Sequence, residues 1–453
     1  MLRPADLPPA RQTRILILDL PAASPAGVVD PEARMPKPWS RSPASLEPVS
    51  HGATATSRGL DQRLLGALLR AVGSPPMELQ LGEDGASARP EGSDEPIARV
   101  RIRDRAALLD ILGHPRVGFA DAYADGRVEI EGDLVRLLEA IYRHEPGSAV
   151  ARFAARLRQR VPRRRHAALA SARENIHHHY DIGNAFYSLW LGRTMAYTCA
   201  YYPTPEATLD EAQEAKFEHV CRKLQLRGGE SVVEAGCGWG GLALHMARRH
   251  GVRVRAFNIS REQIAYARER ARIEGLESEV EFVEDDFRNI SGSYDAFVSV
   301  GMLEHVGIAN YADFGLLIRR CLPRHGRGLI HSIGRNWPLP LHPWITRRIF
   351  PGAQPPSISQ MMQIFEPADL TVLDVENLRP HYARTLRDRL ALYEAGAARI
   401  RAMYDERFLR TWRLYLAGSI AAFNTGMLQL FQVVFAPREN DAVPFTRAHL
   451  YRD

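Results

Sequence analysis

A glycine-rich turn at residues 231–241 constrains the fold of this chain more than any other segment. It reads S-V-V-E-A-G-C-G-W-G-G: β-favouring residues lead to the acidic Glu234, glycines follow, and a helical pattern begins at Leu242. A strand that passes through glycines into a helix brings bare backbone close to a ligand at the helix N-terminus. The spacing differs from the G-x-G-x-x-G pattern of pyrophosphate-binding turns. An acid at the strand end instead suits S-adenosylmethionine (SAM), whose amino-acid end is cationic.

Strand and helix signals alternate after this turn, which predicts an α/β fold with a doubly wound, Rossmann-like parallel sheet. The predicted strands lie near residues 231–235, 252–257, 280–283, 294–300 and 327–333. A Pro- and aromatic-rich insert then runs from 334 to 359. Helices are predicted at about 383–395 and 406–422, and a final strand at 428–435. Additions of this kind usually cover an active site.

The residues before the turn are predicted to form a smaller α+β domain. Its predicted strands are Met77–Leu81, Ala98–Ile102 and Val128–Ile130, its helices lie around Leu64–Leu69 and at 106–112, 119–123 and 134–141, and residues 82–95 form a polar loop. We therefore expect four regions along the chain. They are a mostly disordered extension with a short strand at Arg14–Leu18 (1–58), a small α+β domain (59–146), a basic linker helix (147–170) and a catalytic domain (171–453).

Charge is concentrated in the linker, where residues 151–166 hold seven arginines and no acid. Phe153, Leu157 and Val161 recur there at four-residue spacing. Two interpretations stay open: a solvated linker helix, or a helix that lies on an anionic bilayer surface. Nucleic-acid binding is not predicted, because the segment lacks stacking aromatics and adjoins no recognisable nucleic-acid module.

Neither a membrane span nor a metal site is predicted. No run of about 18 apolar residues occurs, and the N-terminus lacks a secretory signal, so a cytoplasmic location is expected. The four cysteines show no paired spacing, which argues against zinc and against disulfides. Three adjacent histidines at 177–179 also fail the test for a metal site, because consecutive residues rarely point at one ion. The dense aromatics of 180–202 instead predict a π-rich wall that can steady a cationic intermediate.

Polar residues after the second and third sheet strands are candidates for holding the nucleoside. Asn258 and Gln263 are the nearest polar residues at the second strand tip, where nucleoside-binding folds often place a carboxylate. Ser260 is explained as a helix N-cap. After the third strand, Asp286 and Phe287 can bracket an adenine by a hydrogen bond and stacking, although a loop acid and a core aromatic explain them equally well.

Six motifs occur in order along the chain: H-Y-D-I-G-N-x-F-Y, M-A-Y-T-C-A-Y-Y, V-V-E-A-G-C-G-W-G-G, G-M-L-E-H-V-G-x-x-N-Y, H-S-I-G and H-Y-A-R-T-L. On these motifs, about residues 170–436 strongly resemble the cyclopropane-fatty-acyl-phospholipid synthases and their mycolic acid relatives, which are SAM-dependent methyltransferases. The segment F-A-D-A-Y-A-D-G-R-V-E-I-E-G-D-L at 119–134 more weakly resembles the lipid-facing N-terminal domain of the bacterial synthases.

The resemblance implies a reaction and a set of site residues. A cis double bond of a phospholipid acyl chain attacks the SAM methyl group, and a carbocation then closes to a cyclopropane ring by losing a proton to bound bicarbonate. The implied bicarbonate pocket consists of Cys199, Glu304, His331, the Ile333 backbone and Tyr382. The SAM contacts, with Glu234 from the glycine turn, are Tyr197, Thr198, Gly236, Cys237, Gly238, Asn258, Ile259, Ser260, Gln263, Phe287 and Arg288.

The residues themselves make this pocket reasonable. Glu304 and His331 are each predicted to follow a sheet strand, which puts both at the carboxyl edge where such sheets bind ligands. A protonated histidine and a phenol can hold a small anion such as bicarbonate. Glu304 can accept the hydroxyl proton of bicarbonate and so orient the ion as a base.

Four positions depart from the family pattern. Ala185 stands where an acid is common, Asn258 where threonine is usual, Arg389 where tryptophan is expected, and Ser419 where some members carry cysteine. Ala185 and Arg389 leave the acyl-chain shape and the product open. Ser419 excludes a covalent cysteine mechanism at that position.

We therefore expect a cytoplasmic enzyme that is peripherally bound to the inner face of an anionic membrane and acts on unsaturated phospholipid. A second copy of the chain is a further candidate partner. The alternatives are methylation without ring closure, methylation of another lipid or a small amine, and a non-catalytic lipid-binding protein that keeps the fold.

Overall fold

The computed structural model describes residues 55–92, 95–114, 117–144, 182–440 and 444–451. Several predictions lie outside these residues and stay predictions. They concern the mostly disordered extension up to residue 54 with its strand at Arg14–Leu18, the basic linker helix at 147–170 with its arginine segment at 151–166, and the three histidines at 177–179. Residues 55–58, predicted to end the extension, are instead helical.

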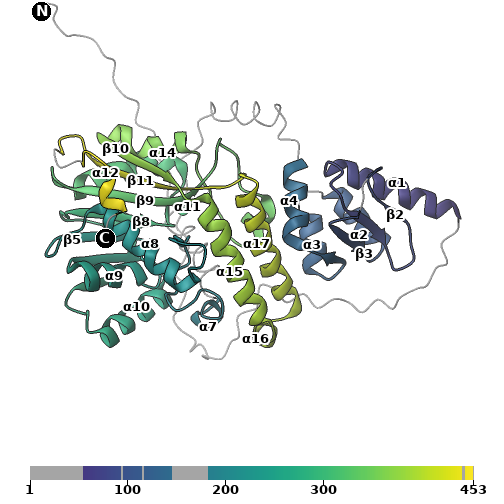
Figure 1. Cartoon of the computed structure of the whole chain (residues 1–453), viewed down its shortest axis with the longest axis horizontal. Helices are drawn as coiled ribbons and strands as arrows, with labels where there is room; N and C mark the ends of the chain where they lie inside the picture. The colour runs from purple at the N-terminus through teal and green to yellow at the C-terminus, as the bar shows by residue number, and fades with distance from the viewer. Residues whose placement is uncertain (1–54, 93–94, 115–116, 145–181, 441–443, 452–453) are drawn as a thin grey trace, which may run out of the picture. The chain divides into compact units, whose positions relative to one another are not determined.

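Within the described residues, seven strands form one mixed sheet with the order β10-β11-β9-β8-β5-β6-β7 (Figure 1). The strands are β5 (Ser231–Ala235), β6 (Arg253–Asn258), β7 (Val280–Glu284), β8 (Ala296–Val300), β9 (Arg327–Gly334), β10 (Leu370–Asn377) and β11 (Gln429–Pro437). Strands β5 to β9 pair in parallel, and β11 runs antiparallel to both of its neighbours. The predicted Rossmann-like fold class is confirmed, and β10 is an additional strand that the sequence pattern did not indicate.

Helices cover both faces of this sheet (Figure 1). One face packs against α8 (Leu209–Leu224), α9 (Gly241–His250) and α10 (Arg261–Glu274), which share an apolar core with the strands. The other face packs against α11 (Leu303–Val306), α12 (Tyr311–Cys321) and α14 (Ile358–Phe365). Burial on both faces explains the continuous apolar runs of β5 and β8.

A second group of helices lies beyond the sheet edge. α15 (Arg379–Ala395) and α17 (Glu406–Asn424) lie side by side, joined by α16 (Ala397–Met403), and each begins close to its predicted start (Figure 1). α7 (Asn184–Tyr187) packs its aromatics against them, since Phe186 meets the ring of Trp412 at 5.1 Å between centroids. The insert after β9 contains the short helix α13 (Pro343–Arg348).

The N-terminal region has its own small sheet, with the order β2-β1-β3-β4. Its elements are α1 (Ala55–Ala71), β1 (Glu78–Leu81), β2 (Ser87–Ala88), β3 (Ala98–Ile102), α2 (Arg105–Gly113), α3 (Gly118–Ala124), β4 (Val128–Gly132) and α4 (Leu134–His144). β3 alternates as its sequence predicts, with Ala98, Val100 and Ile102 buried. The predicted polar loop at 82–95 contains the two-residue strand β2, which differs from the prediction.

Polar bonds join this region to α17 and α13. The guanidinium of Arg410 on α17 donates to the carbonyl of Tyr123 at 2.6 Å and to that of Val128 at 2.7 Å. The Trp344 indole on α13 donates to Asp121 at 3.0 Å. The Arg410 bonds give the Val128 carbonyl a donor and the Tyr123 carbonyl a second donor beside the Gly126 N–H.

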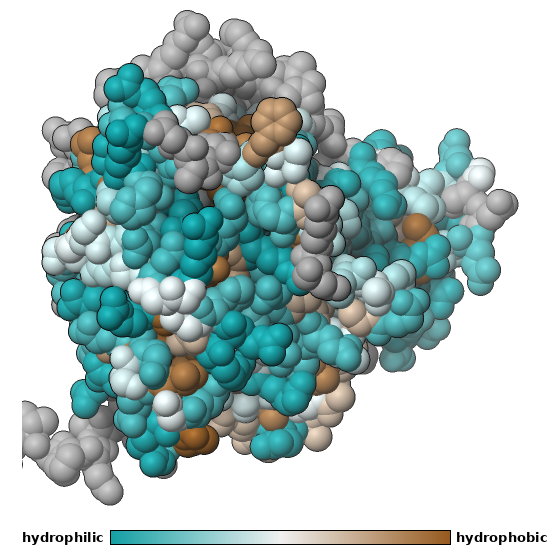
Figure 2. All heavy atoms as spheres, turned by 60° about the vertical axis from the view of Figure 1, so that its left-hand side comes forward, coloured by the Kyte–Doolittle hydropathy of each residue, from teal (hydrophilic) through white to brown (hydrophobic). Residues whose placement is uncertain are grey.

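The described surface is mostly polar. Apolar side chains are scattered in small groups over the face in Figure 2, which is ordinary for a folded protein. None of the helices in the described part of the chain combines the length and apolar character needed to cross a bilayer.

Candidate active site

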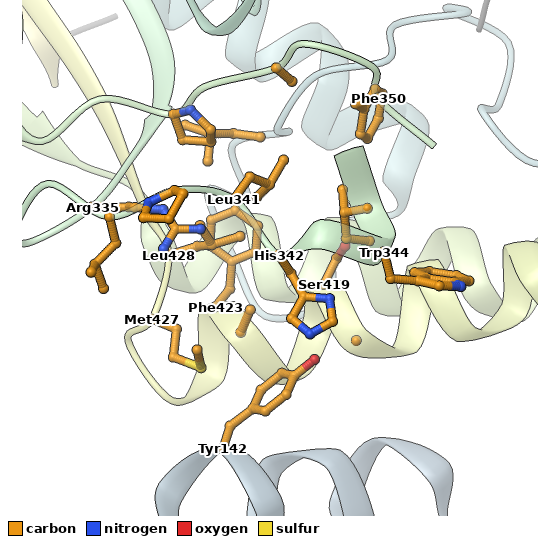
Figure 3. A pocket seen from close by; sticks show the side chains of 18 of the residues that line it. Tyr142, Arg335, Leu341, His342, Trp344, Phe350, Ser419, Phe423, Met427 and Leu428 are labelled. Atoms are coloured by element: carbon orange, nitrogen blue, oxygen red, sulfur yellow. The ribbon is translucent and has the colours of Figure 1, made fainter. Parts of the chain in front are cut away.

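A large cavity of about 1900 Å³ brings together walls from distant parts of the chain. Figure 3 shows three of these walls meeting, with Tyr142 from α4, His342 and Trp344 from the insert, and Ser419 from α17. All five residues of the predicted bicarbonate pocket line this one cavity: Cys199, Glu304, His331, Ile333 and Tyr382. The predicted pocket residues therefore share a hollow in the structure, although no ligand identifies its occupant.

Glu304 enters the cavity from α11, directly after β8. Its Oε1 accepts a hydrogen bond from the Ile333 backbone N–H at 2.6 Å, so this amide is already engaged by the carboxyl group. Its Oε2 is buried and has no hydrogen-bond partner among the described residues. Burial raises the pKa of Glu304 to about 7, so the carboxyl group loses its proton near neutral pH.

His331 offers a single free donor to the same cavity. It lies within β9, inside the strand predicted near 327–333, so the expectation that it follows the strand is wrong. The Gln432 side-chain nitrogen faces Nδ1 at 3.1 Å, which makes Nδ1 the acceptor and puts the ring proton on Nε2. Nε2 is buried without a partner among the described residues. Burial, together with Lys216 and Lys223, lowers the pKa of His331 well below its usual value, so the cavity favours the neutral ring, whereas the sequence predicted a protonated one.

Cys199 and Tyr382 complete this wall as neutral groups. The Cys199 thiol donates to the Ala200 carbonyl at 3.1 Å. The Tyr382 ring, on α15, packs against Phe423 with 4.7 Å between centroids. Burial raises the pKa of both groups, so each keeps its proton and stays a neutral hydrogen-bond donor.

Two buried basic side chains form hydrogen bonds to the loop that carries Tyr197, Thr198 and Cys199. Arg389 is fully buried, and its Nη2 donates to the carbonyls of Ala196 at 2.6 Å and Thr198 at 2.7 Å. Lys216 donates to the Thr198 hydroxyl at 2.9 Å. Arg389 is not among the cavity-lining residues, so its departure from the family pattern acts on this loop and does not reshape the cavity wall directly.

The glycine turn has backbone conformations that favour glycine, in keeping with the tight turn that its sequence predicts. Gly236 and Gly240 have φ angles of 86° and 80°, a region that other residues rarely adopt. A Cβ atom on Gly236 would lie 2.9 Å from the Cβ of Met302. The amides of Gly236 and Cys237 both donate to the Phe257 carbonyl, so these two predicted SAM contacts have no free N–H to offer.

Glu234 ends β5 beside this turn and is almost fully buried. Burial raises the pKa of Glu234 to about 8, and Lys216 only partly opposes this rise. Burial likewise lowers the pKa of Lys216 to about 7. The sequence predicts an anion at Glu234, whereas burial favours the neutral carboxyl, and a cation bound beside it restores the charged form.

The predicted nucleoside contacts after β6 form a connected polar cluster. The Asn258 amide donates to the Gly238 carbonyl at 3.2 Å and to Gln263 at 2.6 Å. Ser260 caps α10, as predicted, by accepting from the Gln263 amide. Ile259 lies between them, half-buried. None of these four residues lines the large cavity, so their role in SAM binding stays a prediction.

The residues after β7 are partnered within the fold, and their roles in SAM binding stay predictions. Arg288 grips the Asp286 carboxylate with two hydrogen bonds of 2.8 and 2.9 Å, so Asp286 is occupied by an ion pair. Phe287 packs edge-on against Phe314 at 5.3 Å. An adenine contact from Asp286 would compete with Arg288, which leaves Phe287 as the better candidate of the two.

Three features of the site were not predicted from sequence. Lys216 belongs to none of the sequence motifs. Only its position on the buried face of α8 could have indicated that it contributes to the site. The hydroxyl of Tyr415 lies 2.9 Å from that of Tyr197 and fixes the aromatic wall. Apolar residues of the N-terminal sheet, such as Leu79 and Val100, also line the cavity.

Two protein families match the chain. The family described as mycolic acid cyclopropane synthetase matches residues 167–433, and a domain of unknown function matches residues 64–150. A probable fatty acid methyltransferase of Pseudomonas putida is 38% identical over 361 residues, covering 76% of this chain and 89% of its own. The cyclopropane-fatty-acyl-phospholipid synthase of Escherichia coli K12 is 40% identical over 259 residues, covering 57% of this chain and 66% of its own.

A solved structure has a similar fold. The mycolic acid cyclopropane synthase CmaA1, in complex with SAH and CTAB, has a TM-score of 0.56 at 28% identity. The match covers 58% of this chain and 98% of that one. The N-terminal region therefore lies largely outside this structural likeness.

Proposed function

This chain belongs to the mycolic acid cyclopropane synthetase family, and from that premise we propose that it converts the cis double bond of an unsaturated phospholipid acyl chain into a cyclopropane ring. It is a SAM-dependent methyltransferase of the cyclopropane-fatty-acyl-phospholipid synthase type. The observation that carries the finer proposal is the single cavity shared by the five predicted pocket residues and the apolar N-terminal sheet.

The size and lining of this cavity support a long apolar substrate. Pockets for drug-sized ligands usually measure roughly 300–1000 Å³, whereas this one measures about 1900 Å³. Leu79, Val100 and Ile102 extend its wall into the N-terminal sheet. An acyl chain bound there is removed from water, which favours binding by about 0.8 kcal/mol per buried CH₂ group.

Bicarbonate fits the polar end of the cavity. A buried donor, His331 Nε2, and a buried acceptor, Glu304 Oε2, both lack partners among the described residues. Buried polar atoms are rarely left unpaired, so this pair indicates a small ligand that can both accept and donate. We propose that His331, Tyr382, Cys199 and Glu304 hold bicarbonate, which when bound supplies a base for the proton lost on ring closure.

The protein's own groups have defined tasks in this proposal. Neutral His331 and Tyr382 donate hydrogen bonds toward negative charge, and Glu304 accepts one and so sets the orientation of the anion. Tyr197, fixed by Tyr415, presents a π-rich wall that stabilises positive charge developing on the substrate. Burial of the whole set excludes water, which would otherwise trap a cationic substrate.

Methylation without ring closure is the second candidate. It is favoured by the Pseudomonas relative, which is named a probable fatty acid methyltransferase. Both products begin with the same methyl transfer and differ only in how the positive charge is resolved. Quenching by hydride would require a reductant in addition to SAM.

The test is lipid mass spectrometry after expression in a host that lacks such an enzyme. Cyclopropane formation adds CH₂ to unsaturated acyl chains and removes the double bond, so the product resists ozonolysis at that position. A methylated chain that keeps a double bond, or a saturated branched chain, supports the second candidate. Unchanged lipids, with SAM binding shown by calorimetry, contradict both.

We also propose that the enzyme works at the membrane surface as a peripheral protein. The seven arginines of residues 151–166 support this, because each basic residue near an anionic bilayer contributes on the order of 1 kcal/mol. Replacing Arg152, Arg156, Arg158 and Arg160 with glutamine should weaken sedimentation with phosphatidylglycerol vesicles. If the variant binds these vesicles at low salt as well as the unmodified protein does, the arginines do not have this role.

A further inference from the structure

A cluster of four metal-ligating side chains lies outside the proposed active site, between α8 and α9. Glu218 and Cys221 are three residues apart on α8, so they share one helix face. His245 is on α9, and His250 is its last residue. The glycine turn precedes the other end of α9, so His250 is separated from the turn by the whole helix and His245 by about half of it.

The four side chains converge closely. The ligand atoms of Cys221, His245 and His250 lie within 4.8 Å of one another. Glu218 Oε2 lies 3.3 Å from His245 Nε2 and 3.1 Å from His250 Nε2. In a tetrahedral zinc site with Zn–N and Zn–O bonds near 2.0–2.1 Å, neighbouring ligand atoms lie about 3.3 Å apart. The two measured separations therefore already match the edges of a zinc tetrahedron.

The surroundings of the cluster orient Glu218 and leave part of the cluster open to solvent, so that a metal ion can enter. Arg222 donates to the other oxygen of Glu218 at 3.2 Å, which turns Oε2 toward the two imidazoles as an outer-shell partner does. Cys221 and His245 are buried, whereas His250 is half-buried and the Glu218 side chain is 30% exposed. A thiolate and a carboxylate together supply two negative charges, which balance a divalent ion.

We propose that Glu218, Cys221, His245 and His250 bind a structural Zn²⁺ ion that fastens α8 to the end of α9. Four protein ligands fill a tetrahedral shell and leave no open position for a substrate, so the ion stabilises the fold and takes no part in methyl transfer. The sequence did not predict this site because its ligands come from two helices, with 23 residues between Cys221 and His245. Hydrogen bonding of Glu218 to both histidines is the alternative, and in it Cys221 is only a buried apolar residue of the core.

The test compares metal content in the full-length protein and its variants. Protein stripped with a chelator is dialysed against Zn²⁺ and then against metal-free buffer, and bound zinc is measured by mass spectrometry. We expect one zinc per chain in the unmodified protein, and less than a tenth of that in Cys221→Ser and in His250→Asn. Two matched controls, the buried Cys321→Ser and the exposed His325→Asn, should retain one zinc.

Cobalt substitution tests the thiolate ligand directly. Co²⁺-loaded protein should show an intense thiolate-to-cobalt charge-transfer band and tetrahedral d–d bands, and Cys221→Ser should lose the charge-transfer band. Circular dichroism checks that each variant is folded. His250→Asn changes a half-buried residue, so it keeps the test usable where Cys221→Ser fails to fold. No retained zinc in the unmodified protein, or equal zinc in His250→Asn and the controls, overturns the proposal.

Discussion

Burial gives the site residues their chemical states. Glu304, His331 and Tyr382 are all nearly inaccessible to water, and in each case burial shifts the pKa toward the neutral form. Glu304 is the only one of the three whose pKa, at about 7, lies where a modest change of pH alters its charge. The proposed site therefore combines two fixed donors with one acceptor whose charge depends on pH.

Replacing Glu304 with glutamine should separate catalysis from stability. Glutamine can still accept from the Ile333 amide but cannot act as an anionic acceptor, so kcat should fall at least about 100-fold, as general-base losses do. SAM affinity, measured by calorimetry, should stay within about twofold. The activity of the unmodified enzyme should be lost as pH falls through about 7. If the residual activity of Glu304→Gln does not fall as pH drops below about 7, the role of Glu304 as an anionic acceptor is supported. Turnover equal to that of the unmodified enzyme contradicts this role.

The stability of the same variant should change in the opposite direction. The rise in pKa from 4.5 to about 7 corresponds to about 3 kcal/mol, because one pKa unit equals about 1.4 kcal/mol. A raised carboxyl pKa favours the folded state below pH 4.5, and this advantage is lost as pH rises through 7. Urea unfolding should therefore show Glu304→Gln gaining stability over the unmodified protein between pH 5.5 and pH 8. The exposed Glu284→Gln should show no such gain.

Arg389 is expected to position the SAM-contacting loop. Both of its bonds to loop carbonyls come from the terminal nitrogen Nη2, a position that the shorter lysine side chain does not reach. The Thr198 carbonyl keeps a bond from Gln213, so the loss falls on the Ala196 carbonyl. Each buried carbonyl left unpaired costs about 1–3 kcal/mol. Arg389→Lys should therefore raise the KM for SAM about tenfold or more, with a smaller effect on kcat. The exposed Arg387→Lys on the same helix is the control, and an unchanged KM for SAM excludes the positioning role.

At the level of elements, the sequence predicted what periodicity and glycine turns encode. β5 to β9 and the two long helices α15 and α17 all lie close to their predicted ranges. β10 was missed because Asp374 and Glu376 interrupt its apolar pattern. The fold compensates for Glu376 with partners distant in sequence: Lys223 at 2.6 Å and His219 at 2.7 Å. No local pattern contains such pairings.

The same limit applies to the candidate site. The pocket residues were predicted from motifs, but the neutral state of His331 depends on burial and on Lys216 and Lys223, which the motifs do not contain. The Arg288 pairing that occupies Asp286 is a side-chain choice that the strand pattern leaves open. Composition and spacing thus predict positions, while charge states and pairings require the packed structure.

α17 forms a wall of the proposed acyl-chain cavity, and Ser419 is the place to test it. Ser419 lines the cavity and is half-buried, so a tryptophan there would occupy space needed by the substrate (Figure 3). Ser419→Trp should lower lipid turnover at least tenfold without changing SAM affinity. Ala391→Trp adds the same side chain to an exposed position on α15 and should have no effect. Normal turnover by Ser419→Trp contradicts the proposed path of the acyl chain.

At the level of the whole molecule, the cavity depends on two regions that fold around separate sheets. The N-terminal sheet supplies apolar walls, and the seven-stranded sheet positions the residues of the proposed chemistry. The contact between them is largely polar at Arg410, whose guanidinium also lies 4.3 Å from the Tyr123 ring centre. Apolar residues of both regions also belong to one buried cluster, so removing Arg410 tests how far the contact depends on its polar bonds.

Arg410→Met tests this coupling. Methionine keeps much of the apolar stem but leaves the Val128 carbonyl without its donor, at a cost of about 1–3 kcal/mol, whereas the Tyr123 carbonyl keeps its bond from the Gly126 N–H. Calorimetry should show the N-terminal region unfolding in a separate, earlier transition, and lipid turnover should fall several-fold. SAM affinity should be retained, because the glycine turn belongs entirely to the other sheet. The exposed Arg399→Met controls for loss of charge. A single transition at an unchanged temperature, with normal lipid turnover, would show that the two regions do not need this contact to form the cavity.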